Sequence, residues 1–552
     1  MIRLSLFALS LVMLACARSQ GAQNAAPSRT VDILIRGGTV VDGSGGAPYA
    51  ADVGIAGDRI AFVGDAARAR VAGTRTIDAR GLVVAPGFID PHTHTLEDLS
   101  SVARHANVAY LMQGVTTVIT GNDGGGPLDV AGTMRQWEER GIGTNAALYV
   151  GQGTVRRSVM GMADAAPTPE QMRAMEAAVV RAMEGGALGL SSGLYYAPGS
   201  YAATDEVIAL ARVAARYGGV YDSHLRDESS YTPGGLLGAV AEAIRIGRDG
   251  GLAVNISHVK ALGADVWGRS DSVIALVRAA RAAGQRVTAD QYPYTASGSS
   301  VGASLLPRWA EVGGRDSLLW RMSDPATRAR LVRDMEENLR RRGGADALLI
   351  TRSRDTSLVG RRLGEVARAR NVAPVAAALD ILRAGDASVA SFNMDERDIE
   401  RLMREPWVMT GSDGSAGHPR KYGTFPRKLA VYVRERHVLS LPAAVRASSA
   451  LAAETFGFRD RGHLREGRLA DVIVFDEARV RDRATYEQPE LLAEGMRWVL
   501  VNGTVAVEDG RYTGALAGRA LRREPRREVR RQPPAGGLTA APPLPYDAMA
   551  DR

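Results

Sequence analysis

Cysteine and lysine are scarce in this chain of 552 residues. Cys16 is the single cysteine, so the folded protein holds no internal disulfide and a packed core must provide its stability. Lysine occurs at positions 260, 421 and 428 alone. Basic segments interleaved with aromatic residues are missing, which argues against nucleic-acid binding. After residue 15 the sequence has no apolar run long enough to span a membrane.

The N-terminus has the pattern of an export signal. Arg3 precedes an apolar run over residues 4–15, and small residues follow around Cys16. This order of charged, apolar and small residues predicts a signal peptide over residues 1–22 and export to the periplasm. Cys16 directly follows the apolar run, which favours a lipoprotein signal with a lipid anchor at Cys16 and attachment to the outer membrane. Ordinary cleavage near Cys16 is the alternative, because residues 13–15 depart from the usual lipoprotein pattern.

The C-terminal end differs from the rest of the chain. Residues 519–531 are rich in arginine and contribute much of the formal net charge of +8, and proline-rich sequence follows. Such a composition offers few side chains for a core. We therefore expect residues 516–552 to form a disordered tail that is solvated or contacts anionic lipid or cell wall.

Two kinds of pattern divide the sequence between these ends. Residues 30–85 and 461–515 contain short alternating apolar runs and the hairpin signal Asn502-Gly503, so we expect one small β-sandwich domain built from both ends of the chain. Over residues 86–460, strand-length apolar runs alternate with helix-length amphipathic segments such as 169–184 and 205–217. This alternation predicts an α/β fold, a (β/α)8 TIM-like barrel with insertions.

Histidine and aspartate side chains recur where the strand-like runs of this middle region end. In PGFIDPHTH, residues 86–94, His92 and His94 are two residues apart and point to the same side of an extended chain. Similar strand ends are followed by Asp123, His224, His258 and Asp413. The carboxyl ends of barrel strands meet at one face, and imidazole is the commonest metal ligand, so these residues predict a metal site. A turn-capping role for Asp123, and a role for Asp413 as a further ligand or turn residue, are the alternatives.

In this order and spacing the motifs resemble the amidohydrolase superfamily of metal-dependent barrel hydrolases. They are most similar to the D-aminoacylases, the N-acyl-D-amino-acid deacylases. The matching stretches lie between residues 31 and 512 and are PGFIDPHTH, GVTTVITGN, GALGLSSGLYYAPGSYA, GGVYDSHLRDE, ISHVKALGADVWGRS, DQYPYTAS, GSDG, HPRKYGTFPR and GRLADVIVFD. The resemblance implies hydrolysis of the amide of an N-acyl-D-amino acid, or of an N-aminoacyl-D-amino acid, with release of the free D-amino acid.

The resemblance also implies a ligand set. It leads us to expect one tightly bound divalent ion at Asp123, His224 and His258, and a second, weaker ion at His92, His94 and the shared Asp123. The family usually has cysteine at the position of Asp123, and a carboxylate is a harder ligand than a thiolate. Zinc is the expected metal, with manganese or cobalt as alternatives.

Further roles follow from the same resemblance. Asp413 would act as general base and then as general acid. Lys260, Tyr292 and Arg420 would bind the α-carboxylate of the substrate, and Tyr196 would hydrogen-bond the carbonyl in the transition state. Three charged residues follow His224 in the sequence, and the sequence does not distinguish a role in supporting that histidine from ion pairs within the loop. They are Arg226, Asp227 and Glu228.

Other functions stay open at this stage. A dipeptidase that cleaves L-Xaa-D-Xaa is a close variant, a cyclic amide hydrolase of the hydantoinase or dihydroorotase type fits less well, and a non-catalytic binding scaffold is a third alternative. The preferred amino-acid side chain depends on the barrel loops 296–310 and 318–391, whose conformation the sequence leaves open. The sequence also leaves the oligomeric state open.

Overall fold

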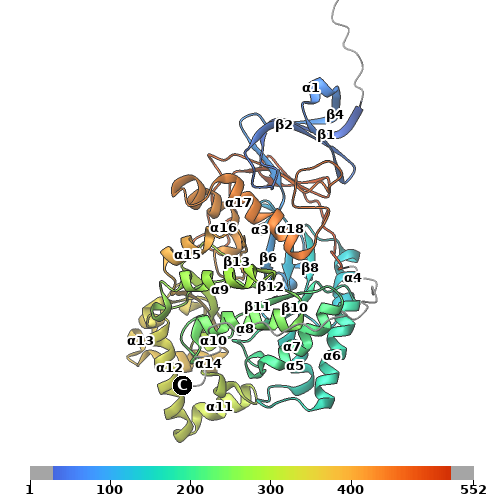
Figure 1. Ribbon diagram of the computed structural model, residues 1–552. Coiled ribbons are helices and arrows are strands. Elements are labelled where there is room, and N and C mark those ends of the chain that lie inside the picture. The colour runs from blue at the N-terminus through green and yellow to red at the C-terminus, as the bar shows by residue number, and fades with distance from the viewer. Residues whose placement is uncertain (1–28, 524–552) are drawn as a thin grey trace, which may run out of the picture.

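The computed structural model describes residues 29–523. The expected signal peptide with Cys16, and residues 524–552 of the expected tail, lie outside the described residues. In Figure 1 the N-terminal strands lie at one end of the molecule, a barrel lies in the middle, and a group of helices from residues 301–384 lies at the other end. Within residues 29–523, no helix combines the length and the apolar character needed to cross a membrane.

Strands from both ends of the chain form one nine-stranded sheet, as the sequence predicts. They are β1 Arg29–Val40, β2 Tyr49–Ala56, β3 Arg59–Gly64, β4 Val71–Asp78, β5 Val83–Pro86, β18 Val472–Phe475, β19 Met496–Val501, β20 Thr504–Glu508 and β21 Arg511–Tyr512. The antiparallel pairing of β5 with β18 joins the two ends. Asn502 and Gly503 have φ angles of 48° and 81°, which are the left-handed values that a tight two-residue hairpin turn requires.

Eight parallel strands follow one another around the barrel, one of them formed by two short strands in succession. They are β6 Phe88–Thr93, β7 Val115–Thr120, β8 Asn145–Leu148 continued by β9 Val150–Gly151, β10 Gly189–Gly193, β11 Val220–His224, β12 Ala253–Ile256, β13 Val287–Gln291 and β17 Val408–Thr410. The barrel closes where the chain after β17 meets the end of β6: the Asp413 amide donates to the His92 carbonyl at 2.9 Å, and the His94 amide donates to the Gly414 carbonyl at 3.2 Å. The closure thus brings Asp413 beside the two histidines.

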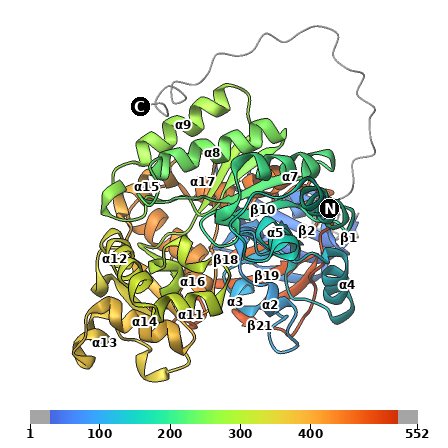
Figure 2. The same ribbon diagram turned by 90° about the horizontal axis from the view of Figure 1, so that it is seen from below.

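Helices surround the barrel, and α7, α8 and α9 pack side by side on its outside (Figure 2). The larger ones are α4 Val130–Arg140, α5 Gln152–Met160, α6 Pro169–Glu184, α7 Thr204–Arg216, α8 Gly235–Gly250, α9 Ser270–Ala282, α15 Glu396–Met403, α16 Arg420–Arg427, α17 Leu441–Ser448 and α18 Ala450–Phe456. Helix α6 has the predicted bounds because a capping box of Thr168 and Gln171 starts it and Pro169 fixes its first turn. Its buried side carries Met175, Val179 and Met183.

Residues 296–392 form a folded insertion subdomain where the sequence suggested barrel loops. Three antiparallel strands build its sheet: β14 Ala296–Ser300, β15 Leu348–Ser353 and β16 Ala387–Phe392. Its helices are α10 Val301–Leu305, α11 Arg315–Ser323, α12 Pro325–Arg341, α13 Leu363–Arg370 and α14 Pro374–Ala384. A core of its own, with Leu331, Met335 and Ile350 fully buried, holds the subdomain together.

The start of the expected disordered tail is wrong by several residues. Residues 516–523 lie along the barrel, where the Ala146 amide donates to the Arg519 carbonyl at 2.9 Å and the Gly518 amide donates to the Ile142 carbonyl at 2.8 Å. The Arg523 guanidinium donates to three backbone carbonyls, those of Leu188, Gly218 and Phe456. Composition did not predict this segment, because backbone pairing and the arginine side chains, together with small apolar contacts of Ala517 and Ala520, hold it against distant parts of the chain.

Lys428 is a buried cation within the helix η6 Lys428–Glu435. Its ammonium donates to the Thr410 hydroxyl at 2.7 Å, and no carboxylate among residues 29–523 forms an ion pair with it. Burial lowers the pKa of Lys428 from 10.5 to about 7. Between these two pH values the unfolded chain therefore binds more protons than the folded chain does. The buried charge lowers the free energy of unfolding by its full amount below pH 7, and this loss disappears above pH 10.5.

Lys428→Met is expected to raise the free energy of unfolding by about 1–2 kcal/mol at pH 6.5 and to have little effect near pH 10, because the substitution removes the buried charge. Urea denaturation at the two pH values measures the difference. The matched control is Lys421→Met, which removes the ammonium 2.5 Å from the Asp98 carboxylate, leaves Arg104 as its remaining cation at 2.6 Å, and should lower the free energy of unfolding at both pH values. An equal gain from Lys428→Met at both pH values would contradict the explanation.

Candidate metal centre and active site

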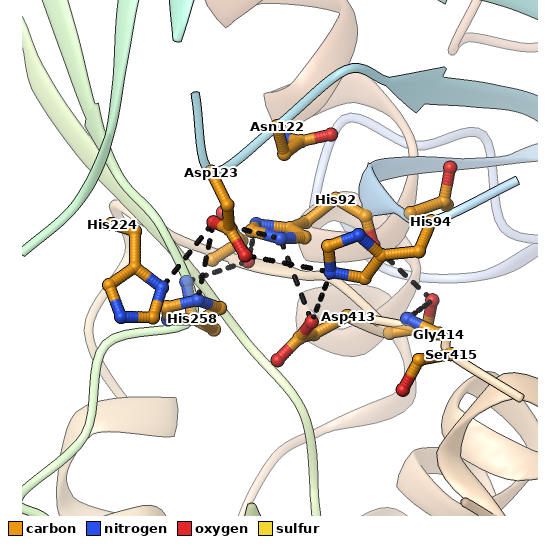
Figure 3. Close-up of polar contacts among 12 residues, drawn as sticks. His92, His94, Asn122, Asp123, His224, His258, Asp413, Gly414 and Ser415 are labelled. Carbon is orange, nitrogen blue, oxygen red and sulfur yellow. Dashed lines mark hydrogen bonds and ion pairs between the residues drawn. The ribbon is translucent and has the colours of Figure 1, made fainter. Parts of the chain in front are cut away.

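The predicted site residues meet at the carboxyl ends of the barrel strands. His92 lies in β6 and His94 follows it, while His224 is the last residue of β11. Asp123, His258 and Asp413 follow β7, β12 and β17. Figure 3 shows their side chains pointing toward one another. The structure thus brings these six residues together at one face of the barrel.

Asp123 lies at the centre of the histidines. Its Oδ1 is 3.5 Å from His92 Nε2, 3.4 Å from His224 Nδ1 and 3.6 Å from His258 Nε2, and its Oδ2 is 3.5 Å from His94 Nε2 (Figure 3). One oxygen thus faces three imidazoles and the other oxygen faces the fourth. The resemblance to the D-aminoacylases implies a shared metal ligand at Asp123, and this carboxylate has a donor atom toward every one of the four histidines.

The donor atoms suit a divalent cation. Asp123 Oδ1, His92 Nε2 and His224 Nδ1 are buried and, among the residues that the structure describes, have no hydrogen-bond partner. Burial acts to lower the pKa of His92, but the carboxylates of Asp123, Asp290 and Asp413 outweigh burial and raise this pKa to about 10. The position thus attracts positive charge strongly. Imidazole and carboxylate ligands together suit zinc, manganese or cobalt.

Three site residues have a strained backbone. Asp123, His258 and Asp413 have φ angles of 56°, 34° and 48°, in the left-handed region that side chains larger than glycine rarely adopt. Each follows a barrel strand, where the turn aims the side chain into the barrel mouth. Such strain persists where surrounding structure enforces it, and it is concentrated at functional sites. Gly126 adds a close approach, since a Cβ there would lie 2.1 Å from the Tyr149 carbonyl oxygen.

Beneath the histidines lies a group of buried carboxylates that the sequence analysis missed. Asp290 accepts the His258 amide at 2.9 Å, and the Asn255 amide group donates to both Asp222 and Asp290 at 2.8 and 2.7 Å. Burial raises the pKa of Asp222 to about 6 and that of Asp90 to about 7. The available signal was a charged residue within an apolar strand run, as in FIDP and VYDSH.

Glu228 supports His258. Its Oε1 is 3.1 Å from His258 Nδ1 and accepts the Lys260 ammonium at 2.5 Å. The Lys260 ammonium lies 2.7 Å from the same Nδ1, so this nitrogen faces both a carboxylate and a cation. With an ion on Nε2 the ring proton is on Nδ1, and of these two neighbours Glu228 is the one that can accept it. Its neighbours do different work: Arg226 binds Glu242, and Asp227 accepts the amides of the loop at 229 and 232. Arg226, Asp227 and Glu228 thus have different contacts, which the sequence alone could not distinguish.

Glu228→Gln is expected to weaken metal binding about 10- to 100-fold, because a neutral amide orients His258 less firmly than a carboxylate does. Competition for the ion with a coloured chelator measures the affinity. The matched control is Glu242→Gln, which removes a loop ion pair with Arg226 and should leave the affinity unchanged. Equal affinities for wild type and Glu228→Gln would contradict a supporting role.

The residues expected to bind the substrate carboxylate also lie together. The Tyr292 ring lies between two cations, with the Arg420 guanidinium carbon 4.7 Å and the Lys260 nitrogen 5.7 Å from its centre. Arg420 also pairs with Asp413 Oδ2 at 2.8 Å. Burial acts to raise the pKa of Asp413, but Arg420 and nearby histidines hold this pKa well below its usual range. Asp413 is therefore ionised beside the donor atoms.

One cavity of about 400 Å³ connects these parts. The metal-centre residues form its floor, and Arg420 and Tyr292 lie at one side. The Tyr196 ring packs against His224 with a centroid distance of 4.6 Å, so its hydroxyl belongs to the same wall. Residues of β14, β15 and β16 line the cavity as well, which makes the insertion subdomain part of the site.

Comparison with known proteins agrees with this architecture. The amidohydrolase family matches residues 75–507. The chain is 36% identical to a D-aminoacylase of Alcaligenes xylosoxydans xylosoxydans over 90% of this chain and 98% of the relative. An N-acyl-D-glutamate deacylase of the same organism is also 36% identical, over 90% of this chain and 97% of the relative.

Solved structures give the same result. A D-aminoacylase crystal structure matches with a TM-score of 0.76 at 34% identity and covers 89% of this chain and 100% of that one. An N-acyl-D-glutamate deacylase from Bordetella bronchiseptica, complexed with zinc and a phosphonate mimic of the tetrahedral intermediate, matches with a TM-score of 0.75 and the same coverage. A dihydropyrimidinase from Brevibacillus agri, at 17% identity and a TM-score of 0.52, shares the fold alone. The chain belongs to the amidohydrolase family and, within it, to the group of the D-aminoacylases.

Proposed function

We propose that the protein hydrolyses the amide bond of N-acyl-D-amino acids and releases the free D-amino acid. The observation that carries the proposal is the position of Arg420, which pairs with Asp413 at the metal centre and stacks on Tyr292 in the same cavity. A substrate carboxylate bound by Arg420 would hold the neighbouring amide next to Asp413. The activities named for the relatives that are 36% identical support the same chemistry.

Each side chain has a defined task in this reaction. A divalent ion bound by the histidines and Asp123 would lower the pKa of a water molecule toward neutrality and polarise the scissile carbonyl. Asp413 accepts the proton of the attacking water and then donates it to the leaving amine. Arg420 and Lys260 hold the α-carboxylate, and the Tyr196 hydroxyl donates to the carbonyl oxygen as negative charge develops on it.

The proposed metal is zinc, with one ion at Asp123, His224 and His258 bound more tightly than a second ion at the His92 and His94 side. A relative of the same group was crystallised with zinc, and a study of D-aminoacylase describes one-metal activation and second-metal attenuation. The carboxylate of Asp123, in place of the cysteine usual in the family, also makes manganese and cobalt acceptable.

The charges of the cavity favour an acyl group over an aminoacyl group. The carboxylates that line it are those of Asp123, Glu228 and Asp413, and each already contacts a cation or a histidine of the site. The free ammonium of an L-Xaa-D-Xaa dipeptide would find no unpaired carboxylate among the described lining residues. A cyclic amide lacks the α-carboxylate that the proposal places at Arg420 and Lys260, which disfavours a hydantoinase-like activity.

A substrate panel tests the function. Purified protein is supplied with zinc, manganese or cobalt and given N-acetyl-D-amino acids, N-acetyl-L-amino acids, L-Xaa-D-Xaa dipeptides and hydantoins. The proposal predicts that free D-amino acid is released from the first group and that a chelator abolishes the release. Cleavage of hydantoins alone, or silence on every compound with a free α-carboxylate, would overturn it.

We propose, from the sequence of residues 1–22, that the protein is exported to the periplasm and anchored to the outer membrane by lipid at Cys16. Cell fractionation of wild type and Cys16→Ser tests this proposal. The wild type should be found with membranes and the variant should not. Equal distribution of both would contradict the anchor.

A further inference from the structure

Arg342 is a buried cation in the cavity without an acidic partner. Its side chain follows helix α12 directly and is 3% exposed. Nε donates to the Tyr231 hydroxyl at 3.0 Å, and Nη2 donates to the Tyr195 hydroxyl at 3.2 Å. Nη1 is buried and has no hydrogen-bond partner among residues 29–523. The guanidinium thus keeps one donor group without a partner in this range, and Arg342 is one of the residues that line the cavity.

Neighbouring arginines show that Arg342 is unusual. Arg308 stacks on the Tyr195 ring at 4.4 Å and pairs with Glu311 at 2.6 Å. Arg341 stacks on the Tyr231 ring at 5.5 Å and pairs with Glu337 at 3.2 Å. Within the described part of the chain, no carboxylate pairs with Arg342, and the tyrosines supply neutral acceptors only.

A buried charge without a counterion is costly, and proteins keep such charges where a ligand completes the pair. The end of α12 favours a cation through its carbonyls, but this effect is small and screened by water, and it would not require burial in the cavity. Guanidinium groups bind carboxylates with paired hydrogen bonds. The unpaired Nη1 of Arg342 therefore suits an anion that arrives with the substrate.

The rest of the cavity wall combines hydroxyl groups with tyrosine rings and small aliphatic side chains. Hydroxyl side chains of the insertion sheet line it at Ser297, Ser299, Ser300, Thr351 and Ser388. The aliphatic side chains among the lining residues are those of Leu262, Val389 and Ala416. The larger apolar surfaces of the wall are the tyrosine rings, and two of these tyrosines, Tyr195 and Tyr231, also accept hydrogen bonds from the Arg342 guanidinium.

We propose that Arg342, with Tyr195 and Tyr231, forms a second anion-binding position of the cavity, which binds a second carboxylate of a dicarboxylic N-acyl-D-amino acid substrate. The inference rests on the proposed deacylase function, and it assigns to Arg342 a role in substrate choice. The first carboxylate is the α-carboxylate at Arg420. The second carboxylate can belong to either of two parts of the substrate, and both parts present the same chemical group. One is the side chain of an acidic D-amino acid, and the other is a dicarboxylic acyl group such as succinyl.

Four compounds separate these sources: N-acetyl-D-glutamate, N-acetyl-D-glutamine, N-succinyl-D-glutamine and N-acetyl-D-leucine. Glutamine has nearly the shape of glutamate without its side-chain charge. The wild-type kcat/KM should be about 100-fold higher for the compound whose second carboxylate reaches Arg342 than for N-acetyl-D-glutamine. Arg342→Met should remove this preference, mainly by raising KM, and should change kcat/KM for N-acetyl-D-glutamine less than about 3-fold.

The matched control is Arg341→Met, which changes the adjacent arginine on the same tyrosine but lies outside the cavity lining. It should keep the preference. Should Arg342→Met fail to fold, product inhibition of the wild type gives the same information, because free D-glutamate or succinate should inhibit about 10-fold more strongly than D-glutamine or acetate.

The outcomes are distinct. A preference for N-acetyl-D-glutamate that Arg342→Met removes supports the side-chain source, and a preference for N-succinyl-D-glutamine that it removes supports the acyl source. Turnover of the neutral compounds without any preference, or a preference that survives Arg342→Met, overturns the inference and leaves the deacylase function standing. Absence of turnover on all four compounds overturns the proposed function and the inference with it.

Discussion

Asp413→Asn is expected to lower kcat about 10³- to 10⁴-fold and to leave the bound metal in place. An asparagine amide cannot accept the proton of the attacking water, and general-base catalysis accounts for a factor of this size. The metal should stay because Asp123 and the histidines keep their donor atoms, which surround Asp123 Oδ1 at 3.4–3.6 Å. Single-turnover kinetics together with metal analysis by mass spectrometry measures both effects on one preparation.

Asp482→Asn provides the matched control, because Asp482 pairs with Arg427 at 3.2 Å and does not line the cavity. It should keep wild-type turnover. The result would count against a proton-transfer role for Asp413 if Asp413→Asn lost metal in proportion to activity, because Asp413 would then act as a ligand.

The second large effect concerns Asp123. Asp123→Ala should remove the tightly bound ion and abolish turnover, because among residues 29–523 this carboxylate is the one that faces His92, His94, His224 and His258 together. The loss of metal affinity should exceed the 10- to 100-fold that is typical of supporting residues around a metal site. Equilibrium dialysis against a metal buffer measures it.

Asp123→Cys keeps an anionic ligand at the same position and changes its hardness. A thiolate is a softer ligand, so this variant should bind zinc again and should discriminate against manganese more strongly than the wild type does. Retention of wild-type zinc affinity in Asp123→Ala, or identical metal preferences of wild type and Asp123→Cys, would show that Asp123 is not the central ligand.

Much of this architecture is visible in the sequence, because its determinants are local. The two residues of the Asn502-Gly503 turn fix a hairpin by their own backbone preferences, and the capping box at Thr168 fixes the start of α6. The site histidines could be found because each directly follows a strand-like run, and barrel strands end at a common face.

Other parts depend on contacts between distant segments, and local pattern could not give them. Arg342 reaches Tyr195 only because the insertion subdomain brings the end of α12 beside that tyrosine, which lies 147 residues away along the chain. Glu228 could not be distinguished from Arg226 and Asp227 until the loop placed its carboxylate 3.1 Å from His258 Nδ1. Residues 516–523 were missed because their backbone and arginine hydrogen bonds reach residues far away in the sequence, which composition does not describe.

Metal reconstitution with two pairs of enantiomers tests whether the protein is a metal-dependent hydrolase that is specific for D-amino acids. Protein freed of metal by a chelator is titrated with zinc while the cleavage of N-acetyl-D-glutamate, N-acetyl-D-glutamine and their L-enantiomers is followed. We expect no turnover without metal. The first equivalent of zinc should raise the turnover of the D-compounds, and the L-compounds should not be cleaved. Turnover by the metal-free protein, or equal cleavage of both enantiomers, would contradict this expectation.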